Sequence, residues 1–288
     1  MMDKVDLSVA IVTRNRPQWL RRCLTSWRSL SIQPFEIVVS DDSDPEFNHE
    51  VEQIASEFDC RYVKGPRRGL YANRNNAALS CRGSHIMSAD DDHTHPPDFV
   101  RALIMKIETD PDAIWTVGER SPDHPNAPVS IPGELRSNGI VGPPEDPNQS
   151  AAIACGSTAY PRKVFELGHR CDETYRFGGL WYLWGHRLRK AGFRIRYCQD
   201  TFVFHHTESS NLRRDDLTFA AAQLECNLYV NAAHAFRVSH NPKALLRTLK
   251  SALRFLTIGE QAQGHARKIR IRPASVARAF ILAARWSW

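Results

Sequence analysis

The sequence lacks several features that would assign the protein to a specialised class. No run of about 18 apolar residues occurs in its 288 residues, so a membrane-spanning helix is not predicted. The seven cysteines are odd in number, scattered and without a CxxC pair, which argues against a disulfide framework or a structural zinc site. The first residues show no signal-peptide pattern. We therefore expect a cytoplasmic protein with reduced, mostly buried thiols.

Positive charge is concentrated near the C-terminus. The formal net charge is +6, and ten of the 38 lysines and arginines lie from Pro242 to Trp288, where Glu260 is the one acidic residue. The rest of the chain is slightly acidic, so the basic character belongs to this last segment. We expect residues 216–288 to form a helical, basic C-terminal extension.

The first helix of this extension is predicted to be amphipathic. Its leucines fall within about 80° on a helical wheel at about 100° per residue: Leu245, Leu249, Leu253 and Leu256. Four cations cluster on the opposite side: Lys243, Arg247, Lys250 and Arg254. Either the leucine face packs on the preceding domain, or the helix lies on an anionic membrane, at its inner face. Nucleic-acid binding is not expected, because no recognised module accompanies the charge.

Residues 1–215 show an α/β pattern. Short apolar runs typical of buried parallel strands, such as Leu7–Val12 and Phe35–Val39, alternate with segments of helical periodicity, such as Leu20–Leu30. This alternation predicts βαβ units and a Rossmann-like, mostly parallel sheet flanked by helices. Residues 121–148 are rich in Pro, Gly and Asn, and we expect a long functional loop there.

Polar clusters follow three of the predicted strands, at Thr13–Arg16, Asp41–Asp44 and Asp90–His93. Open parallel sheets bind ligands beyond the carboxyl ends of their strands, so we expect the clusters to meet in one crevice. The triplet Asp90–Asp92 places three carboxylates together, which is unfavourable unless a cation compensates. Mg²⁺ and Mn²⁺ take oxygen ligands and also bind substrate phosphates. The alternative is a solvated acidic turn that caps the next helix.

Further short motifs follow in a characteristic order. The full series is Ser8–Pro17, Glu36–Ser43, Gly69–Asn75, Asp90–Asp92, Cys155–Ser157, Cys171–Tyr175, Gly185–Gly192 and Phe202–His206. Together these motifs resemble the inverting GT-A glycosyltransferases called family 2. The resemblance implies a GT-A catalytic domain over residues 1–215, with a nucleotide-binding half at about 1–100 and an acceptor half at about 101–215. It implies metal-dependent, inverting transfer of a sugar from a UDP- or GDP-linked donor to an acceptor hydroxyl or amine.

The resemblance also implies roles for individual residues. Thr13 and Arg14 would line the nucleotide pocket, and Asp41 would hydrogen-bond the base, with Asp42 beside it. The alternatives are a helix start for Thr13 and a turn at Asp41–Ser43. The other residues expected to contact substrate are Arg74, Asn75, Asp90, Asp91 and Trp181.

The acidic triplet would supply the DxD pair of the family. Asp90 and Asp92 would bind Mn²⁺ or Mg²⁺, and we expect Asp92 to bind the metal directly. A histidine after the last strand would complete the metal site. We favour His205 over His206 for this ligand.

The sequence departs from the family at the expected general base. Relatives carry a Glu-Asp pair at the start of a helix where this chain has Leu180 and Trp181, and neither of these accepts a proton. Three explanations are open: another acid serves, the reaction is of a different type such as retaining, or the protein is a nucleotide-sugar-binding pseudoenzyme or membrane-surface scaffold. The nearby candidate acids are Asp172, Glu173 and Glu208. Trp181 and Trp184 would form an aromatic platform for an acceptor ring, with core packing as the alternative. A nucleotidyltransferase is a lesser alternative, because Thr13–Pro17 lacks glycine.

Overall fold

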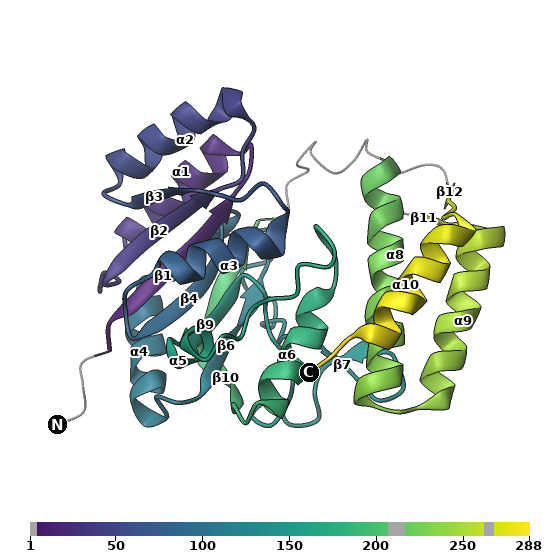
Figure 1. The fold of residues 1–288 in the computed structure, drawn as a ribbon. Helices are drawn as coiled ribbons and strands as arrows, with labels where there is room; N and C mark the ends of the chain where they lie inside the picture. Colours follow the sequence, from purple (N-terminus) through teal and green to yellow (C-terminus); the bar gives the residue numbers. More distant parts are fainter. Residues whose placement is uncertain (1–4, 207–216, 262–267) are drawn as a thin grey trace.

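An eight-stranded sheet forms the centre of the computed structural model, which describes residues 5–206, 217–261 and 268–288 (Figure 1). The strand order is β3-β2-β1-β4-β9-β6-β10-β5. The strands are β1 (Leu7–Thr13), β2 (Glu36–Asp41), β3 (Arg61–Lys64), β4 (His85–Asp90), β5 (His93–Thr94), β6 (Ile114–Arg120), β9 (Ser157–Pro161) and β10 (Ile195–His205). Strands β1 to β4 pair in parallel, β10 runs parallel to β6, and β9 is antiparallel to both β4 and β6. The mostly parallel α/β sheet predicted from the sequence is confirmed.

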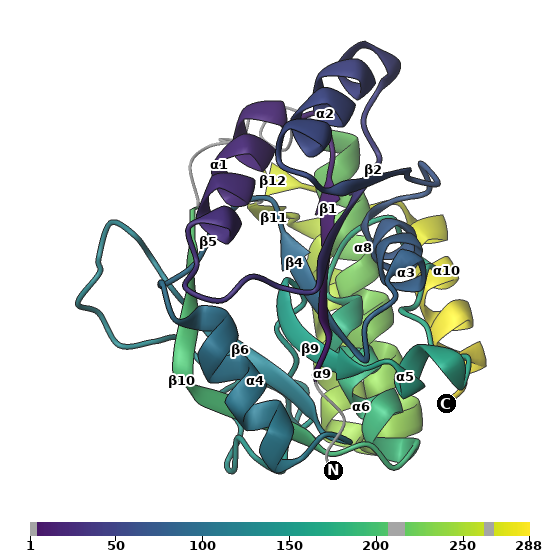
Figure 2. The ribbon, with the colours of Figure 1, turned by 90° about the vertical axis from the view of Figure 1, so that its left-hand side faces the viewer.

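Helices cover both faces of this sheet because side chains alternate along each strand. The helices are α1 (Pro17–Arg28), α2 (Pro45–Glu57), α3 (Leu70–Ser80), α4 (Phe99–Thr109), α5 (Lys163–Glu166) and α6 (Leu180–Lys190). On β1, Leu7, Val9 and Ile11 pack in the core with α1, α2 and α4. Ala10 and Val12 pack in the opposite core, with α3, α5 and α6. Figure 2 shows α1 and α3 on opposite sides of β1.

The chain from residue 217 onward forms a helical unit beside the sheet (Figure 1). It contains α8 (Leu217–Ala233), the π-helical turn η1 (His234–Val238), α9 (Pro242–Thr257) and α10 (Pro273–Arg285), with a short pair β11 (Glu260–Gln261) and β12 (Lys268–Ile269). A core that includes Leu183, Tyr229 and Phe255 joins this unit to α6. Among the helices of the described residues, none is both long enough and apolar enough to span a bilayer.

Two local features differ from expectation. The long loop at 121–148 contains a small hairpin of β7 (Glu134–Leu135) and β8 (Val141–Gly142), which pair antiparallel. The hairpin is too short to show periodicity in the sequence.

The helix α9 buries a face that its leucines do not predict. The face packed on the rest of the protein holds Ala244, Thr248, Ala252 and Phe255. Leu246, Leu249 and Leu253 are exposed, at 52%, 48% and 62%. The interpretation that the leucine face packs on the domain is therefore wrong for Leu249 and Leu253. Small residues let helices approach closely, since the side chains at the contact set the distance between their axes.

Candidate active site

The carboxyl ends of β1, β2 and β4 lie side by side, because these strands are parallel neighbours. Thr13 pairs with Asp41 on β2, and Val12 pairs with Asp90 on β4. Thr13 Oγ1 donates a hydrogen bond of 2.6 Å to Asp91 Oδ2. The polar clusters predicted after these strands therefore meet at one edge of the sheet.

Each carboxylate of the acidic triplet has a different environment. The buried Arg74 donates from Nη2 to both oxygens of Asp90, at 2.7 and 2.9 Å. Asp91 is buried and accepts a hydrogen bond from Arg16 Nε at 3.2 Å. Arg16 also donates from Nη1 to Asp92 Oδ2 at 3.2 Å. Two arginines therefore offset part of the repulsion within the triplet.

Burial and charge move the pKa values of two of these aspartates in opposite directions. Burial raises the pKa of Asp91 to about 7, against the opposing charge of Arg16. Burial also acts to raise the pKa of Asp90, but the adjacent Arg74 guanidinium holds that pKa below its ordinary value. Asp90 is therefore ionised at neutral pH and forms an ion pair with Arg74.

The third aspartate, Asp92, presents an oxygen to two imidazoles. Its Oδ1 is buried and has no hydrogen-bond partner. The Nε2 atoms of His93 and His205 lie 3.8 and 4.0 Å from this oxygen. One ligand atom from each residue lies within 4.8 Å of the other two. An ion with ligand distances of about 2.1 Å fits among three such atoms.

Hydrogen bonds on the far side of each ring orient the two imidazoles. His93 Nδ1 lies 3.1 Å from the carbonyl oxygen of Gly156, and the buried Nε2 of His93 has no partner. His205 Nδ1 lies 2.8 Å from Glu119 Oε2. A carbonyl or carboxylate on one nitrogen is the usual way to direct the other nitrogen at a metal. Burial acts to lower the pKa of His205, but Glu119 raises it to about 9, so metal binding there would displace a proton.

His93 is a candidate ligand that the sequence analysis missed. It pairs with His205 across the antiparallel strands β5 and β10, which are far apart in the sequence. Its position directly after the acidic triplet is the one signal that the sequence offers. Of the two histidines considered after β10, His205 reaches the cluster, whereas His206 Nε2 lies 2.8 Å from Thr94 Oγ1. Asp90 is not part of the cluster, and its role as a ligand stays a prediction.

Asp41 and Asp42, predicted to contact the base, are both buried at the end of β2. The Asp41 carboxylate accepts hydrogen bonds from Asn48 at 2.8 Å and from Tyr62 at 3.1 Å, which fix its orientation. Asp42 Oδ1 accepts from the Arg67 backbone N–H at 2.7 Å, and burial raises the pKa of Asp42. A contact of either aspartate with a nucleobase stays a prediction.

Arg14, Arg74 and Asn75 lie near the same edge in very different settings. The Arg14 side chain is 62% exposed, 3.8 Å from Asp44. The Arg74 guanidinium is buried and forms an ion pair with Asp90. Asn75 Nδ2 donates a hydrogen bond of 2.8 Å to Glu173 Oε1, which connects α3 to the segment before α6. Direct donor contacts by these three side chains stay predictions.

The carboxylates considered as general base already have partners. Both oxygens of Asp172 accept hydrogen bonds, one of them from Tyr229 Oη at 2.8 Å. Glu173 accepts from Asn75 at 2.8 Å and from an exposed arginine at 3.0 Å. Glu208 lies outside the described residues. Neither of the two described candidates therefore offers a carboxylate without a partner.

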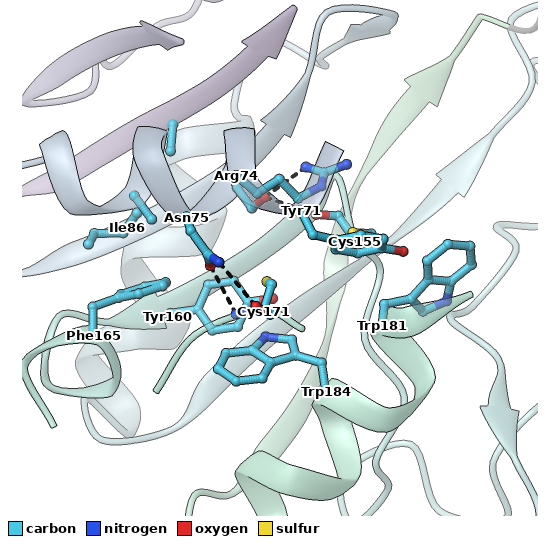
Figure 3. A pocket seen from close by; sticks show the side chains of 13 residues that line it. Tyr71, Arg74, Asn75, Ile86, Cys155, Tyr160, Phe165, Cys171, Trp181 and Trp184 are labelled. Carbon is cyan, nitrogen blue, oxygen red and sulfur yellow. Dashed lines mark hydrogen bonds between the residues drawn. The ribbon is translucent and has the colours of Figure 1, made fainter. Parts of the chain in front are cut away.

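The start of α6, where the family has its acidic pair, borders a small cavity. Leu180 is buried, and Trp181 is half-buried. Trp181 and Trp184 project from α6 toward the cavity, which Tyr71 and Arg74 also line (Figure 3). Its volume is about 20 Å³, which holds water and not a sugar. Trp184 is buried and belongs to the core, whereas a platform role for the more accessible Trp181 stays a prediction.

Comparison with known proteins places this geometry in a family context. The model of the family described as "Glycosyl transferase family 2" matches residues 8–168. Glycosyltransferase GlyA of Streptococcus pneumoniae is 30% identical over 103 residues, which are 35% of this chain and 15% of that protein. Undecaprenyl-phosphate 4-deoxy-4-formamido-L-arabinose transferase of Pseudomonas fluorescens is 26% identical over 174 residues, which are 56% of this chain and 47% of that protein. The chain thus spans less than half the length of either relative.

Solved structures share the fold. GalNAc-T7 with UDP, GalNAc and Mn²⁺ has a TM-score of 0.62 at 17% identity, over 80% of this chain and 48% of that chain. S. aureus TarS 1–349 in complex with UDP-GlcNAc has a TM-score of 0.63 at 13% identity, over 97% of this chain and 81% of that chain. Mannosyltransferase PcManGT of Pyrobaculum calidifontis with GDP-Man and Mn²⁺ has a TM-score of 0.58 at 17% identity, over 100% of this chain and 77% of that chain. These similarities confirm the predicted GT-A fold.

Proposed function

We propose that this chain, which belongs to glycosyl transferase family 2, transfers a sugar from a nucleoside diphosphate sugar to a nucleophilic group of an acceptor. The observation that carries the proposal is the convergence of Asp92, His93 and His205 beside the carboxyl ends of β1 and β4. Nucleotides bind at this edge of open parallel sheets. UDP, UDP-GlcNAc or GDP-Man in the similar structures supports a donor of the same class here.

The ligand atoms of this cluster suit a divalent transition ion such as Mn²⁺. Two imidazole nitrogens and one carboxylate oxygen are a mixed set, whereas Mg²⁺ prefers oxygen alone. Asp92, His93 and His205 would hold the ion, and Glu119 would orient the His205 ring. When bound, such an ion neutralises negative charge on a diphosphate leaving group.

The surrounding residues position this cluster. Arg16 hydrogen-bonds both Asp91 and Asp92. It holds Oδ2 of Asp92, whereas Oδ1 has no hydrogen-bond partner and faces the two imidazoles. Arg74 pairs with Asp90 and keeps that carboxylate ionised within the buried edge. Thr13, Asp41 and Asp42 would line the nucleoside, in accord with their places after β1 and β2.

The acceptor reaction has no assigned base in the described residues. Inversion at the anomeric carbon is proposed from the family, and Asp172 and Glu173 stay the described candidates for the base. The rival proposal is a protein that binds the donor without turnover, motivated by Leu180 and Trp181 at the usual acidic positions. Donor binding with no transfer to any of a broad acceptor panel would favour the rival.

The proposal is tested by measuring release of nucleoside diphosphate from UDP- and GDP-sugars, with Mn²⁺ and with EDTA. We expect release from one donor class, dependent on Mn²⁺ and lost in Asp92→Asn and His93→Gln. His206→Gln is the matched control, because it removes a neighbouring imidazole outside the cluster, and it should retain release. Release that is unaffected by EDTA and by both site variants would overturn the assignment of the cluster.

The exposed leucines of α9 support a further part of the proposal, peripheral binding to an anionic membrane. Leu246, Leu249 and Leu253 form an exposed row along the helix, beside the row of cations that includes Lys243 and Lys250. An apolar row bordered by cations is the pattern of helices that lie in the interface of anionic bilayers. The protein should sediment with phosphatidylglycerol vesicles and not with phosphatidylcholine vesicles. The double variant Leu249→Ser, Leu253→Ser should lose sedimentation with phosphatidylglycerol vesicles. Unchanged sedimentation of the double variant would contradict the proposed membrane-binding face of α9.

A further inference from the structure

A groove of about 710 Å³ lies between the C-terminal helices and the sheet domain. It is formed by the β7–β8 hairpin, the start of α6, the C-terminal part of α8 and one side of α9. Its lining residues are Leu135, Gly139, Val141, Gly179, Tyr182, Asn227, Leu228, Val230, Asn231, Arg247, Thr248, Lys250, Ser251, Arg254 and Phe255. The volume is within the range of sites for small ligands, about 300–1,000 Å³.

The two walls of the groove differ in chemistry. The α9 wall carries Arg247, Lys250 and Arg254, and no carboxylate belongs to the described lining. The opposite wall is mixed. Val141 and the ring of Tyr182 offer apolar surface, and Asn227 and Asn231 offer amides. A ligand with an anionic group and an extended, less polar part fits this arrangement.

Neighbouring contacts leave much of the positive charge available to a ligand. Arg247 Nη1 donates a hydrogen bond of 2.8 Å to the carbonyl oxygen of Asn138. This partner is neutral, so the charge of Arg247 stays uncompensated. Arg254 pairs with Glu260, which lies outside the lining. Lys250 makes no hydrogen bond or ion pair with another described residue. Guanidinium and ammonium groups arranged in this way are typical of sites for phosphate.

The groove is connected to the proposed reaction site through α6. Gly179 and Tyr182 line the groove, and Trp181 between them lines the small cavity beside Arg74. Tyr71, from the same helix as Arg74, donates its hydroxyl hydrogen bond to the Gly178 carbonyl oxygen. Figure 1 shows α6 between the sheet and the C-terminal helices. A ligand in the groove would therefore extend from the start of α6 toward α9.

We propose that this groove binds a phosphate ester group of the acceptor, at a distance from the group that receives the sugar. The proposal rests on the proposed glycosyl transfer and names the chemical class of its acceptor. The cations of α9 would bind the phosphate, and Val141 and Tyr182 on the opposite wall would contact the chain that it esterifies. The phosphate ester is shared by two sources, a lipid phosphate and a soluble phosphate ester, and the probes below separate them.

The test is calorimetric titration of the full chain with decyl phosphate below its micelle concentration, with glycerol 3-phosphate, and with the uncharged decyl maltoside. We expect decyl phosphate to bind and decyl maltoside not to bind. Lys250→Glu should weaken binding by about tenfold or more, because it places a like charge beside the phosphate. Lys268→Glu on β12 is the matched control, because it reverses the charge of an exposed lysine outside the groove lining, and it should change binding by less than about twofold.

The outcomes separate the source of the ligand from the failure of the proposal. Tighter binding of decyl phosphate than of glycerol 3-phosphate assigns a lipid phosphate, and binding of glycerol 3-phosphate that is equal or tighter assigns a soluble phosphate ester. Equal effects of Lys250→Glu and Lys268→Glu, or displacement of decyl phosphate by saturating nucleotide with Mn²⁺, would overturn the groove site. If no nucleotide binds while decyl phosphate still binds at Lys250, the proposed function fails and the groove site stands.

Discussion

Replacing Glu119 by glutamine tests whether Asp92, His93 and His205 form a metal site. Glu119 Oε2 lies 2.8 Å from His205 Nδ1, on the side of the ring away from the cluster. Glutamine has the same size and keeps an acceptor oxygen, so the variant removes the charge and retains the packing. A loss of metal affinity would therefore reflect the electrostatic support of the His205 ring.

The expected size of this loss follows from the contact. Carboxylate partners of metal-bound histidines typically contribute about 10- to 100-fold in metal affinity. We expect the Mn²⁺ affinity of Glu119→Gln to fall by that factor, which corresponds to about 1.4–2.7 kcal/mol. The control is Glu57→Gln, which removes one negative charge from an exposed pair with Arg21 and should leave the affinity unchanged.

The assay is electron paramagnetic resonance of free Mn²⁺, titrated with the wild-type protein and with each variant. The signal of the hexaaqua ion decreases as Mn²⁺ binds, so each dissociation constant is obtained directly. Thermal unfolding of the three proteins without metal shows whether the fold is retained. Equal dissociation constants for wild type, Glu119→Gln and Glu57→Gln would refute the assignment of Glu119 as the partner of a metal-bound His205.

Three further predictions address the site and the fold. His93→Gln should weaken Mn²⁺ binding by more than about tenfold in the same titration, because it removes an imidazole ligand whose Nδ1 atom is held by the Gly156 carbonyl oxygen. Unchanged binding would exclude His93 as a ligand. Gly185→Ala should lower the free energy of unfolding in urea by about 2 kcal/mol or more, because its Cβ would lie 1.8 Å from the Ala151 carbonyl oxygen; a neutral effect would contradict this packing of α6. Burial lowers the pKa of both His186 and His234 to about 4. As the pH drops below about 6.5, these histidines become protonated in the unfolded chain but not in the folded one, so the free energy of unfolding falls. Between pH 7 and pH 5 the loss should be about 2 kcal/mol for each histidine. Asp91 and His205, whose pKa values are raised, change the stability in the opposite direction over this range, so the wild type is compared with the His186→Gln, His234→Gln double variant. The same pH dependence of unfolding in the two proteins would contradict the prediction.

The sequence predicts the edge of the sheet well because the relevant information is local. Each short apolar run followed by a polar cluster indicates a strand and its carboxyl end. Parallel pairing then brings Thr13, Asp41 and Asp90 to one edge, as the register of β1 with β2 and β4 confirms. Asp92 and His205 are predicted from the resemblance to family 2, which implies a DxD pair and a histidine after the last strand.

The parts that the sequence does not reveal depend on contacts between distant segments. His93 becomes a candidate ligand because β5 pairs antiparallel with β10, and two-residue strands leave no periodic pattern. The pairing of Arg74 with Asp90 depends on how α3 packs against β4. A helical wheel locates the leucines of α9, but the close contact is made by small side chains such as Ala244 and Ala252, which hydrophobicity alone ranks lower.

The most direct test of the central claim is calorimetric titration of the nucleoside diphosphates and their sugars with and without Mn²⁺, on the wild type and on Asp92→Ala. The account predicts that one nucleotide binds, that binding requires Mn²⁺, and that the variant loses it. Such a result would establish the donor site and identify the base of the donor. Absence of binding for every nucleotide under every metal condition would contradict the account and leave a glycosyltransferase fold without a donor site.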